Sequence, residues 1–181
     1  MERIKKQVFI INGSGGCGKD TFVQFVANEI SKLSNNKLIV GNYSSVDKVK
    51  EIARIIGWTE GKTEKDRKFL SDLKLLCAKY NDMPFKCMTN RYNTFKINNE
   101  IILFLHIREP EEIERAVKAF KAKTILIKRP DVAHITTNMA DKNVFNYQYN
   151  YTINNDGNLG KFKNMAKLFA DKYFRLLAIS K

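Results

Sequence analysis

Apolar residues follow two alternating patterns along the chain, and together they predict strands that alternate with helices. Residues 8–11, 38–40, 101–105 and 124–127 are apolar at nearly every position, which is typical of strands buried on both faces of a parallel sheet. Residues 151–153 form a weaker fifth run. Between these runs the apolar positions recur every three or four residues, the spacing of amphipathic helices. Such alternation indicates crossover connections and an α/β fold with helices on both faces of a parallel sheet.

The segments between the strands carry signals for where helices begin. Thr63 and Asp66 resemble a capping box, with Asp in place of the usual Glu, and the helix behind them is expected to pack through one apolar face. That face consists of Phe69, Leu70, Leu73, Leu76, Cys77 and Tyr80. Pro110 suits the first position of a later helix, and acidic residues follow it. Further helices are predicted over residues 21–33, 47–56, 83–95 and 159–178.

A glycine-rich loop separates the first strand from the first helix. Gly13, Gly18 and Lys19 fit the G-x-x-x-x-G-K (Walker A) motif in the strand-to-helix context that the motif requires. Glycines bring backbone N–H groups close to phosphate oxygens, and the helix N-terminus adds partial positive charge. We therefore expect this loop to bind a nucleoside triphosphate, with the lysine reaching the β- and γ-phosphates. The loop consists of Gly13, Ser14, Gly15, Gly16, Cys17, Gly18 and Lys19.

A dinucleotide-binding turn is a rival interpretation of the same loop. Gly13, Gly15 and Gly18 also fit the G-x-G-x-x-G motif. However, a dinucleotide-binding turn also requires an acidic residue at the end of the second strand. Residues 42–45 contain no acid, and Lys19 would have no role. The phosphate loop is the better explanation.

The residue after the lysine departs from the motif. Ser or Thr usually stands there and ligates magnesium, whereas this chain has Asp20, with Thr21 following. Asp20 either holds Mg²⁺, directly or through water, or caps the helix as a carboxylate. The two roles are compatible, and both Asp20 and Thr21 belong to the candidate triphosphate site.

Composition and charge limit the class of protein. The 181 residues are 44% hydrophobic and 28% charged, which suits one globular domain, and no apolar run approaches the roughly 20 residues of a membrane helix. Cys17, Cys77 and Cys87 are odd in number and lack metal-type spacing, so a reducing, cytoplasmic compartment is expected. The net charge of +13 favours anionic partners. Its lysines are scattered and no nucleic-acid motif occurs, so small nucleotides are favoured, while nucleic acid and a homodimer stay open.

Several segments resemble one family. Gly18-Lys19-Asp20-Thr21 is similar to the phosphate loop of the bacteriophage-type deoxynucleoside monophosphate kinases, a branch of the P-loop kinases. Residues 45–51, 107–112 and 153–157 resemble the segments that follow this family's second, third and last strands. The resemblance implies a three-layer sandwich with a five-stranded parallel sheet of order 2-3-1-4-5. It also implies one domain over residues 1–181, an acceptor-binding helical insert at about 44–98 and a lid at about 130–147.

The same resemblance implies ATP-dependent phosphoryl transfer to a nucleoside monophosphate, with Mg²⁺. It places Asp47, Lys50 and Arg108 on the acceptor side, where a guanidinium can hold a phosphate bidentately. Arg129 follows a strand and either meets the transferring phosphate or is a surface cation. The predicted catalytic residues are therefore Lys19, Arg108 and Arg129. The remaining arginines of the insert, expected on solvated helix faces, are Arg54, Arg67 and Arg91.

Two departures from the family keep other functions open. His106 stands where the family usually has Asp, and the lid contains no arginine. The second hypothesis is a kinase for another small phosphorylated acceptor, such as dephospho-coenzyme A or a phosphomevalonate-like compound. The third is a P-loop protein that binds nucleotide or nucleic acid without catalysis.

Overall fold

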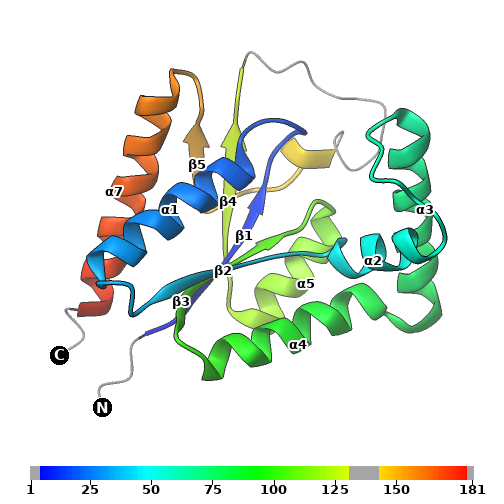
Figure 1. The fold of residues 1–181 in the computed structure, drawn as a ribbon, viewed down its shortest axis with the longest axis horizontal. Coiled ribbons are helices and arrows are strands. Elements are labelled where there is room, and N and C mark those ends of the chain that lie inside the picture. The colour runs from blue at the N-terminus through cyan, green and yellow to red at the C-terminus, as the bar shows by residue number, and fades with distance from the viewer. Residues whose placement is uncertain (1–4, 131–142, 179–181) are drawn as a thin grey trace.

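Five parallel strands form a single sheet at the centre of the molecule (Figure 1). The computed structural model describes residues 5–130 and 143–178. The strands are β1 (Gln7–Asn12), β2 (Ile39–Ser44), β3 (Glu100–His106), β4 (Lys123–Lys128) and β5 (Tyr151–Asn154). Their order is β2-β3-β1-β4-β5, and every pairing is parallel. This confirms the α/β fold class and the sheet order that the family resemblance implied.

Helices cover both faces of the sheet (Figure 1). The helices of the described residues are α1 (Lys19–Leu33), α2 (Asp47–Ile55), α3 (Glu64–Asn81), α4 (Met83–Ile97), α5 (Pro110–Phe120) and α7 (Leu159–Ala178), with a 3₁₀ turn at Asn143–Phe145. One hydrophobic cluster joins α1 and α7 to the sheet, and a second joins α4 and α5 to its other face. Among the helices in the described parts of the chain, none combines the length and the hydrophobicity needed to cross a bilayer.

The central strands are apolar throughout because each of their faces meets a helical layer. In β1, Phe9 and Ile11 enter the cluster with α1 and α7, whereas Val8 and Ile10 enter the cluster with α4 and α5. Successive side chains of a strand point to opposite faces, so a run without polar positions is what burial on both sides requires. The four residues are at most 3% exposed.

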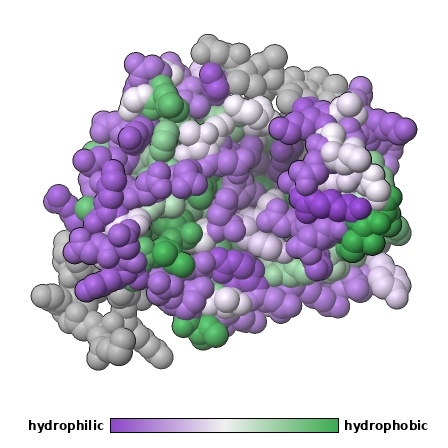
Figure 2. Space-filling view, viewed as in Figure 1, coloured by the Kyte–Doolittle hydropathy of each residue, from purple (hydrophilic) through white to green (hydrophobic). Residues whose placement is uncertain are grey.

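The predicted apolar face of α3 is only partly covered. Four of its six residues are half-buried, namely Phe69, Leu70, Leu73 and Cys77. The capping box at its start is present, since Thr63 accepts the Asp66 N–H and Asp66 accepts the Thr63 N–H. However, α3 has no buried residue, and Leu76 and Tyr80 are 65% and 85% exposed. The helix packs on α2 and α4 instead of on the sheet, so no deep core is available to it. Figure 2 shows hydrophobic side chains gathered on the surface over α3 and the end of α2.

Arg91 of α4 also lies elsewhere than expected. Its Nη2 is 2.5 Å from Glu100 Oε1, and the two side chains are only 19% and 10% exposed, so the predicted solvated helix face is wrong for this arginine. The pair lies against Gly41 of β2, where a Cβ would collide with the guanidinium. The missing side chain of Gly41 therefore makes room for a mostly buried ion pair.

Replacing Arg91 with Met should destabilise the protein by about 3 kcal/mol, because a buried carboxylate that loses its partner is strongly unfavourable. Urea denaturation would measure the change in the free energy of unfolding. Lys68→Met is the matched control, since its pair with Asp72 is 75% and 62% exposed. Exposed pairs contribute under about 1 kcal/mol. Equal losses in the two variants would contradict the importance of the Arg91 pair.

Candidate functional site

Three strand ends meet at one edge of the sheet and form the walls of a cleft. Because β2, β3 and β1 are neighbours and parallel, the segments that follow them lie side by side at their carboxyl ends, where ligands of such sheets bind. The cleft has a volume of about 440 Å³ and is closed on its far side by α3. Figure 2 shows the surface hollowed between α1 and α3, with mostly hydrophilic residues around the opening.

The phosphate loop has the backbone shape that its glycines permit. Gly13 has φ +148°, and a Cβ there would collide with the carbonyl oxygen of Ile127 and the thiol of Cys17. Gly18 has φ +101° and is the N-cap residue of α1. Residues that carry a side chain rarely adopt such backbone angles, so both positions require glycine. The loop therefore passes close to β4 and ends at the N-terminus of α1, a geometry suited to anions.

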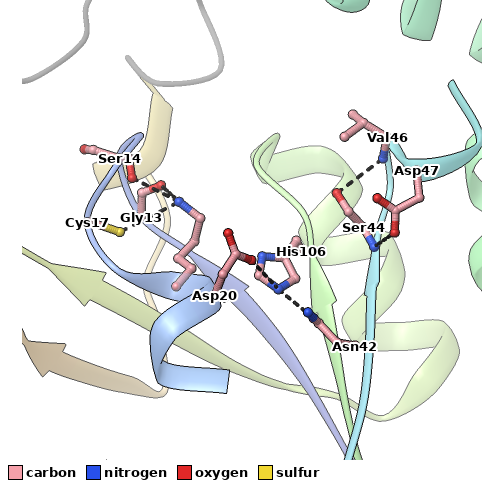
Figure 3. A network of polar contacts seen from close by, with 10 residues as sticks. Gly13, Ser14, Cys17, Asp20, Asn42, Ser44, Val46, Asp47 and His106 are labelled. Carbon is pink, nitrogen blue, oxygen red and sulfur yellow. Dashed lines mark hydrogen bonds and ion pairs between the residues drawn. The ribbon is translucent and has the colours of Figure 1, made fainter. Parts of the chain in front are cut away.

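Lys19 is the first residue of α1 and folds back over the loop. Its Nζ donates to the carbonyl oxygens of Gly13, at 2.6 Å, and Ser14, at 3.0 Å (Figure 3). The ammonium also lies 3.7 Å from the sulfur of Cys17, which is buried. Burial raises the pKa of the Cys17 thiol, and the charge of Lys19 opposes this shift. Cys17 thus packs beneath the loop as a buried thiol, so only its backbone is placed to meet a ligand.

His106, the last residue of β3, connects the loop side of the cleft to β2. Its Nε2 lies 2.8 Å from Asn42 Oδ1 and 3.8 Å from Asp20 Oδ1 (Figure 3). Burial lowers the pKa of His106 to about 4; the carboxylate of Asp20 opposes this, while nearby cations add to it. The ring is therefore neutral at pH 7. Asn42 Oδ1 can only accept hydrogen bonds, so the proton of the neutral His106 ring is assigned to Nε2.

Asp20 is the strongest candidate for a metal ligand in the cleft. It is the second residue of α1, and its side chain is 91% exposed beside the loop. Within the described ranges, no three His, Cys, Asp or Glu side chains gather where they could hold a metal ion. Mg²⁺ usually keeps several waters and binds through one or two carboxylates together with substrate phosphates. The residues present therefore fit a magnesium ion that arrives with a nucleotide better than a resident one.

Cations from outside the phosphate loop also line the cleft. Its lining includes Lys50 of α2, Arg67 and Lys74 of α3, and Arg108 just beyond β3. Lys74 is paired with Glu112, at 2.6 Å, through side chains that are 12% and 29% exposed. The positive charge of the cleft is thus greater than the sequence analysis expected, because Arg67 of α3 contributes to it.

The carboxylate of Asp47 is engaged within its own loop. Its Oδ2 accepts the backbone N–H of Ser44 at 2.7 Å (Figure 3). The residue lines the cleft at the first position of α2, where the helix N-terminus favours negative charge. This hydrogen bond holds the turn between β2 and α2, so a contact with an acceptor would be an additional role.

The predicted site residues fall into two groups. The cleft brings together Gly15, Gly16, Lys19, Asp20, Asp47, Lys50 and Arg108. The other predicted loop residues, Gly13, Ser14, Cys17 and Gly18, are not part of this lining. Arg129, exposed just beyond β4, and Thr21, exposed on α1, are also outside it. Arg67, expected on a solvated face, does line the cleft, whereas Arg54 pairs with Glu60 on the surface. Residues 131–142 of the candidate lid lie outside the described residues.

Two asparagines near the site were missed by the sequence analysis. Asn155 donates to the carbonyl of Cys17 at 3.0 Å and so ties the phosphate loop to the end of β5. Asn12 ends β1 and bonds to residues on three different segments. The sequence signal that could have identified them is their position directly after predicted strands, because such positions gather at the ligand-binding edge of the sheet.

Comparison with known proteins supports the fold. No protein-family profile matches the chain, and no curated protein is significantly similar to it in sequence. A crystal structure of thymidylate kinase from Ehrlichia chaffeensis aligns with a TM-score of 0.51 and 10% identity, over 94% of this chain and 99% of that one. Shikimate kinase from Aquifex aeolicus aligns with a TM-score of 0.47 and 12% identity, over 93% and 99%. The first alignment shows that the chain has the P-loop kinase fold, while the narrower resemblance to bacteriophage-type enzymes stays a prediction.

His106 should make the protein sensitive to acid. The pKa of this group is about 4 in the folded protein and about 6.5 in the unfolded chain. Between these two pH values the unfolded chain binds a proton at His106 and the folded protein does not, so acid favours unfolding. Its contribution to stability is complete above pH 6.5 and is lost as the pH falls toward 4. By pH 4.5 the loss should reach about 2 kcal/mol. Urea denaturation in metal-free buffer at pH 7.5 and 4.5 would measure it, with His106→Gln as the non-titrating control. Parallel losses in both proteins would show that His106 is not responsible.

Proposed function

We propose that this protein transfers the γ-phosphoryl group of ATP to a small acceptor that carries its own phosphate, with a (deoxy)nucleoside monophosphate as the first candidate. The observation that carries the proposal is that the cleft containing Lys19 and the phosphate loop is also lined by cations outside the loop. These are Lys50, Arg67 and Arg108, and they could form a second anion site in the same cleft. A reaction between two phosphorylated substrates needs such a pair of anion sites, with space between them for transfer.

On the donor side, the loop N–H groups and Lys19 would bind the triphosphate. The ammonium now donates to two neutral carbonyl oxygens, and phosphate oxygens would replace these with stronger, charge-assisted hydrogen bonds. Magnesium bound with the nucleotide would neutralise charge on the β- and γ-phosphates, and Asp20 would hold it directly or through water. Gly13 to Gly18 would provide the backbone cradle, with Thr21 beside it at the start of α1.

On the acceptor side, Arg108 would hold the acceptor phosphate through its planar guanidinium, assisted by Lys50. Positioning and positive charge supply most of the catalysis in phosphoryl transfer, and an acceptor phosphate is already an adequate nucleophile. No strong general base is then required. Asp47 would contact the acceptor only in addition to its hydrogen bond with Ser44. Arg129 remains a proposed catalytic cation that would have to approach the transferring phosphate from the end of β4.

The organisation of the chain fits this proposal. Helices α2, α3 and α4 make up the predicted acceptor-binding insert at about 44–98, and α2 and α3 contribute residues to the cleft. The proposal keeps one domain over residues 1–181, a lid at about 130–147 and a cytoplasmic location. Nucleotides are its proposed partners; nucleic acid and a homodimer are not needed for the reaction.

One observation favours a second function, nucleotide binding without catalysis. A neutral His106 stands at the end of β3 where the resembling family usually has a carboxylate. A panel of nucleoside monophosphates, dephospho-coenzyme A and phosphomevalonate, assayed with ATP and Mg²⁺ for ADP release, would distinguish the hypotheses. Transfer to a nucleotide supports the first proposal and transfer to another acceptor redirects it. ATP binding without any transfer would support the second function.

Lys19→Met should lower kcat/KM for ATP by at least about 100-fold, because a preorganised charge on the transferring phosphate is lost. Steady-state ADP release with the best acceptor would measure the change. Lys32→Met, at the exposed end of the same helix, should retain full activity. Activity of Lys19→Met within about threefold of the wild type would remove the loop from the mechanism.

Arg108→Lys should lower kcat/KM for the acceptor by about 10- to 100-fold while KM for ATP changes little. Lysine keeps the charge but loses the two parallel N–H donors that match a phosphate. The control is Arg115→Lys. It alters the exposed ion pair between Arg115 of α5 and Asp82, the N-cap residue of α4. A variant at position 108 that affects KM for ATP and spares the acceptor would place this arginine on the donor side instead.

A further inference from the structure

Asn12 connects the phosphate loop to the segment that follows β3. The residue is fully buried at the end of β1. Its Oδ1 accepts the backbone N–H of Gly13 at 2.8 Å, and its Nδ2 donates to the backbone carbonyl of Arg108 at 3.2 Å. One side-chain amide therefore contacts the first residue of the phosphate loop and the residue proposed to hold the acceptor. Any rotation of this amide would disturb both contacts together.

Tyr149 fixes the orientation of that amide. The second proton of Asn12 Nδ2 is donated to Tyr149 Oη at 2.7 Å, and the hydroxyl in turn donates to the carbonyl of Val144 at 2.8 Å. The hydroxyl thus accepts from one partner and donates to the other, which fixes the direction of both bonds. Burial raises the pKa of Tyr149 to about 12, so the phenol keeps its proton at all ordinary pH values.

The rest of the tyrosine is held in place by packing. Its ring contacts the hydrophobic cluster that joins α4 and α5 to the sheet, and lies edge-on to Tyr147, with ring centroids 5.2 Å apart. The amide torsion of asparagine is broad and is not set by rotamer preference alone. A hydroxyl on a fixed ring is therefore the part of this network that selects one amide orientation.

We propose that Tyr149 is a positioning residue which acts through Asn12 to hold the phosphate loop and Arg108 in register with each other. The inference rests on the proposed phosphoryl transfer, and it deepens that function by adding a residue that contacts neither substrate. Transfer between two bound phosphates is sensitive to displacements of about 1 Å, so loss of register should affect turnover more than binding. A hydroxyl with a purely structural role would affect stability and leave turnover unchanged.

Tyr149→Phe tests the inference, because it keeps the ring and removes the hydroxyl. We expect kcat to fall about tenfold while KM for each substrate changes less than about threefold. In the absence of substrates, hydrogen exchange of the backbone over residues 12–18 should become about tenfold faster. The matched control is Tyr173→Phe, which removes a similar hydroxyl hydrogen bond, to Tyr151 at 3.0 Å, in the cluster on the opposite face of the sheet. It should change neither quantity.

A double-mutant cycle with Asn12→Ala provides a second readout. If Tyr149 acts through Asn12, adding Tyr149→Phe to Asn12→Ala should lower kcat by less than about twofold further. Full additivity of the two effects, or unchanged kcat and unchanged exchange in Tyr149→Phe, would overturn the inference. The exchange measurement needs neither substrate nor Asn12→Ala, so it decides the matter even if that variant fails to fold. A wild-type protein without transferase activity would overturn the proposed reaction, and the exchange result would still show whether Tyr149 holds the loop.

Discussion

The register of β3 between its two neighbours is the constraint on which the whole site depends. His106, the last residue of β3, is aligned with Ile11 of β1 on one side and with Ser44 of β2 on the other. The phosphate loop, the histidine and the turn into α2 therefore begin at the same level of the sheet. A shift by one residue would turn every side chain of β3 to the opposite face, and both faces are buried, so the hydrophobic clusters fix this register. The core thus determines where the polar residues of the cleft lie.

Charge gives the cleft its chemical character once the sheet has placed the residues. Desolvation is the main cause of the low pKa of His106, but Lys19, Lys50 and Arg108 each lower it further and Asp20 alone among the named charges raises it. Three cations and one carboxylate thus act on this histidine. An anionic ligand would relieve the repulsion among these cations. Two phosphorylated substrates, in the proposed reaction, would supply that compensation from both sides.

The elements that the sequence predicts well are those whose cause is local. Burial on two faces leaves an apolar run, and the phosphate loop needs glycine at Gly13 and Gly18 for reasons within a few residues of chain. The sheet order is not encoded in any single segment; it was implied by the family resemblance. Arg67 and Arg91 were misassigned because their surroundings come from distant segments, the cleft in one case and Glu100 with β2 in the other. Asn12 and Tyr149 are separated by 137 residues, and no periodicity connects them.

The position of Asp20 bears on how the histidine at the end of β3 affects metal binding. The resembling family usually carries a carboxylate on that strand, and a histidine there suggested weakened metal handling. In this structure Asp20 Oδ1, from the first turn of α1, lies 3.8 Å from His106 Nε2. A carboxylate therefore still stands in this part of the cleft, and it is the one that the resembling family also has in its phosphate loop. The ring is neutral and hydrogen-bonded to Asn42, so it adds no positive charge that would repel a cation. The exchange of Asp for His at position 106 thus leaves one carboxylate, Asp20, where the resembling family would have two. A magnesium ion that arrives with a nucleotide would have to rely on Asp20 and the phosphates.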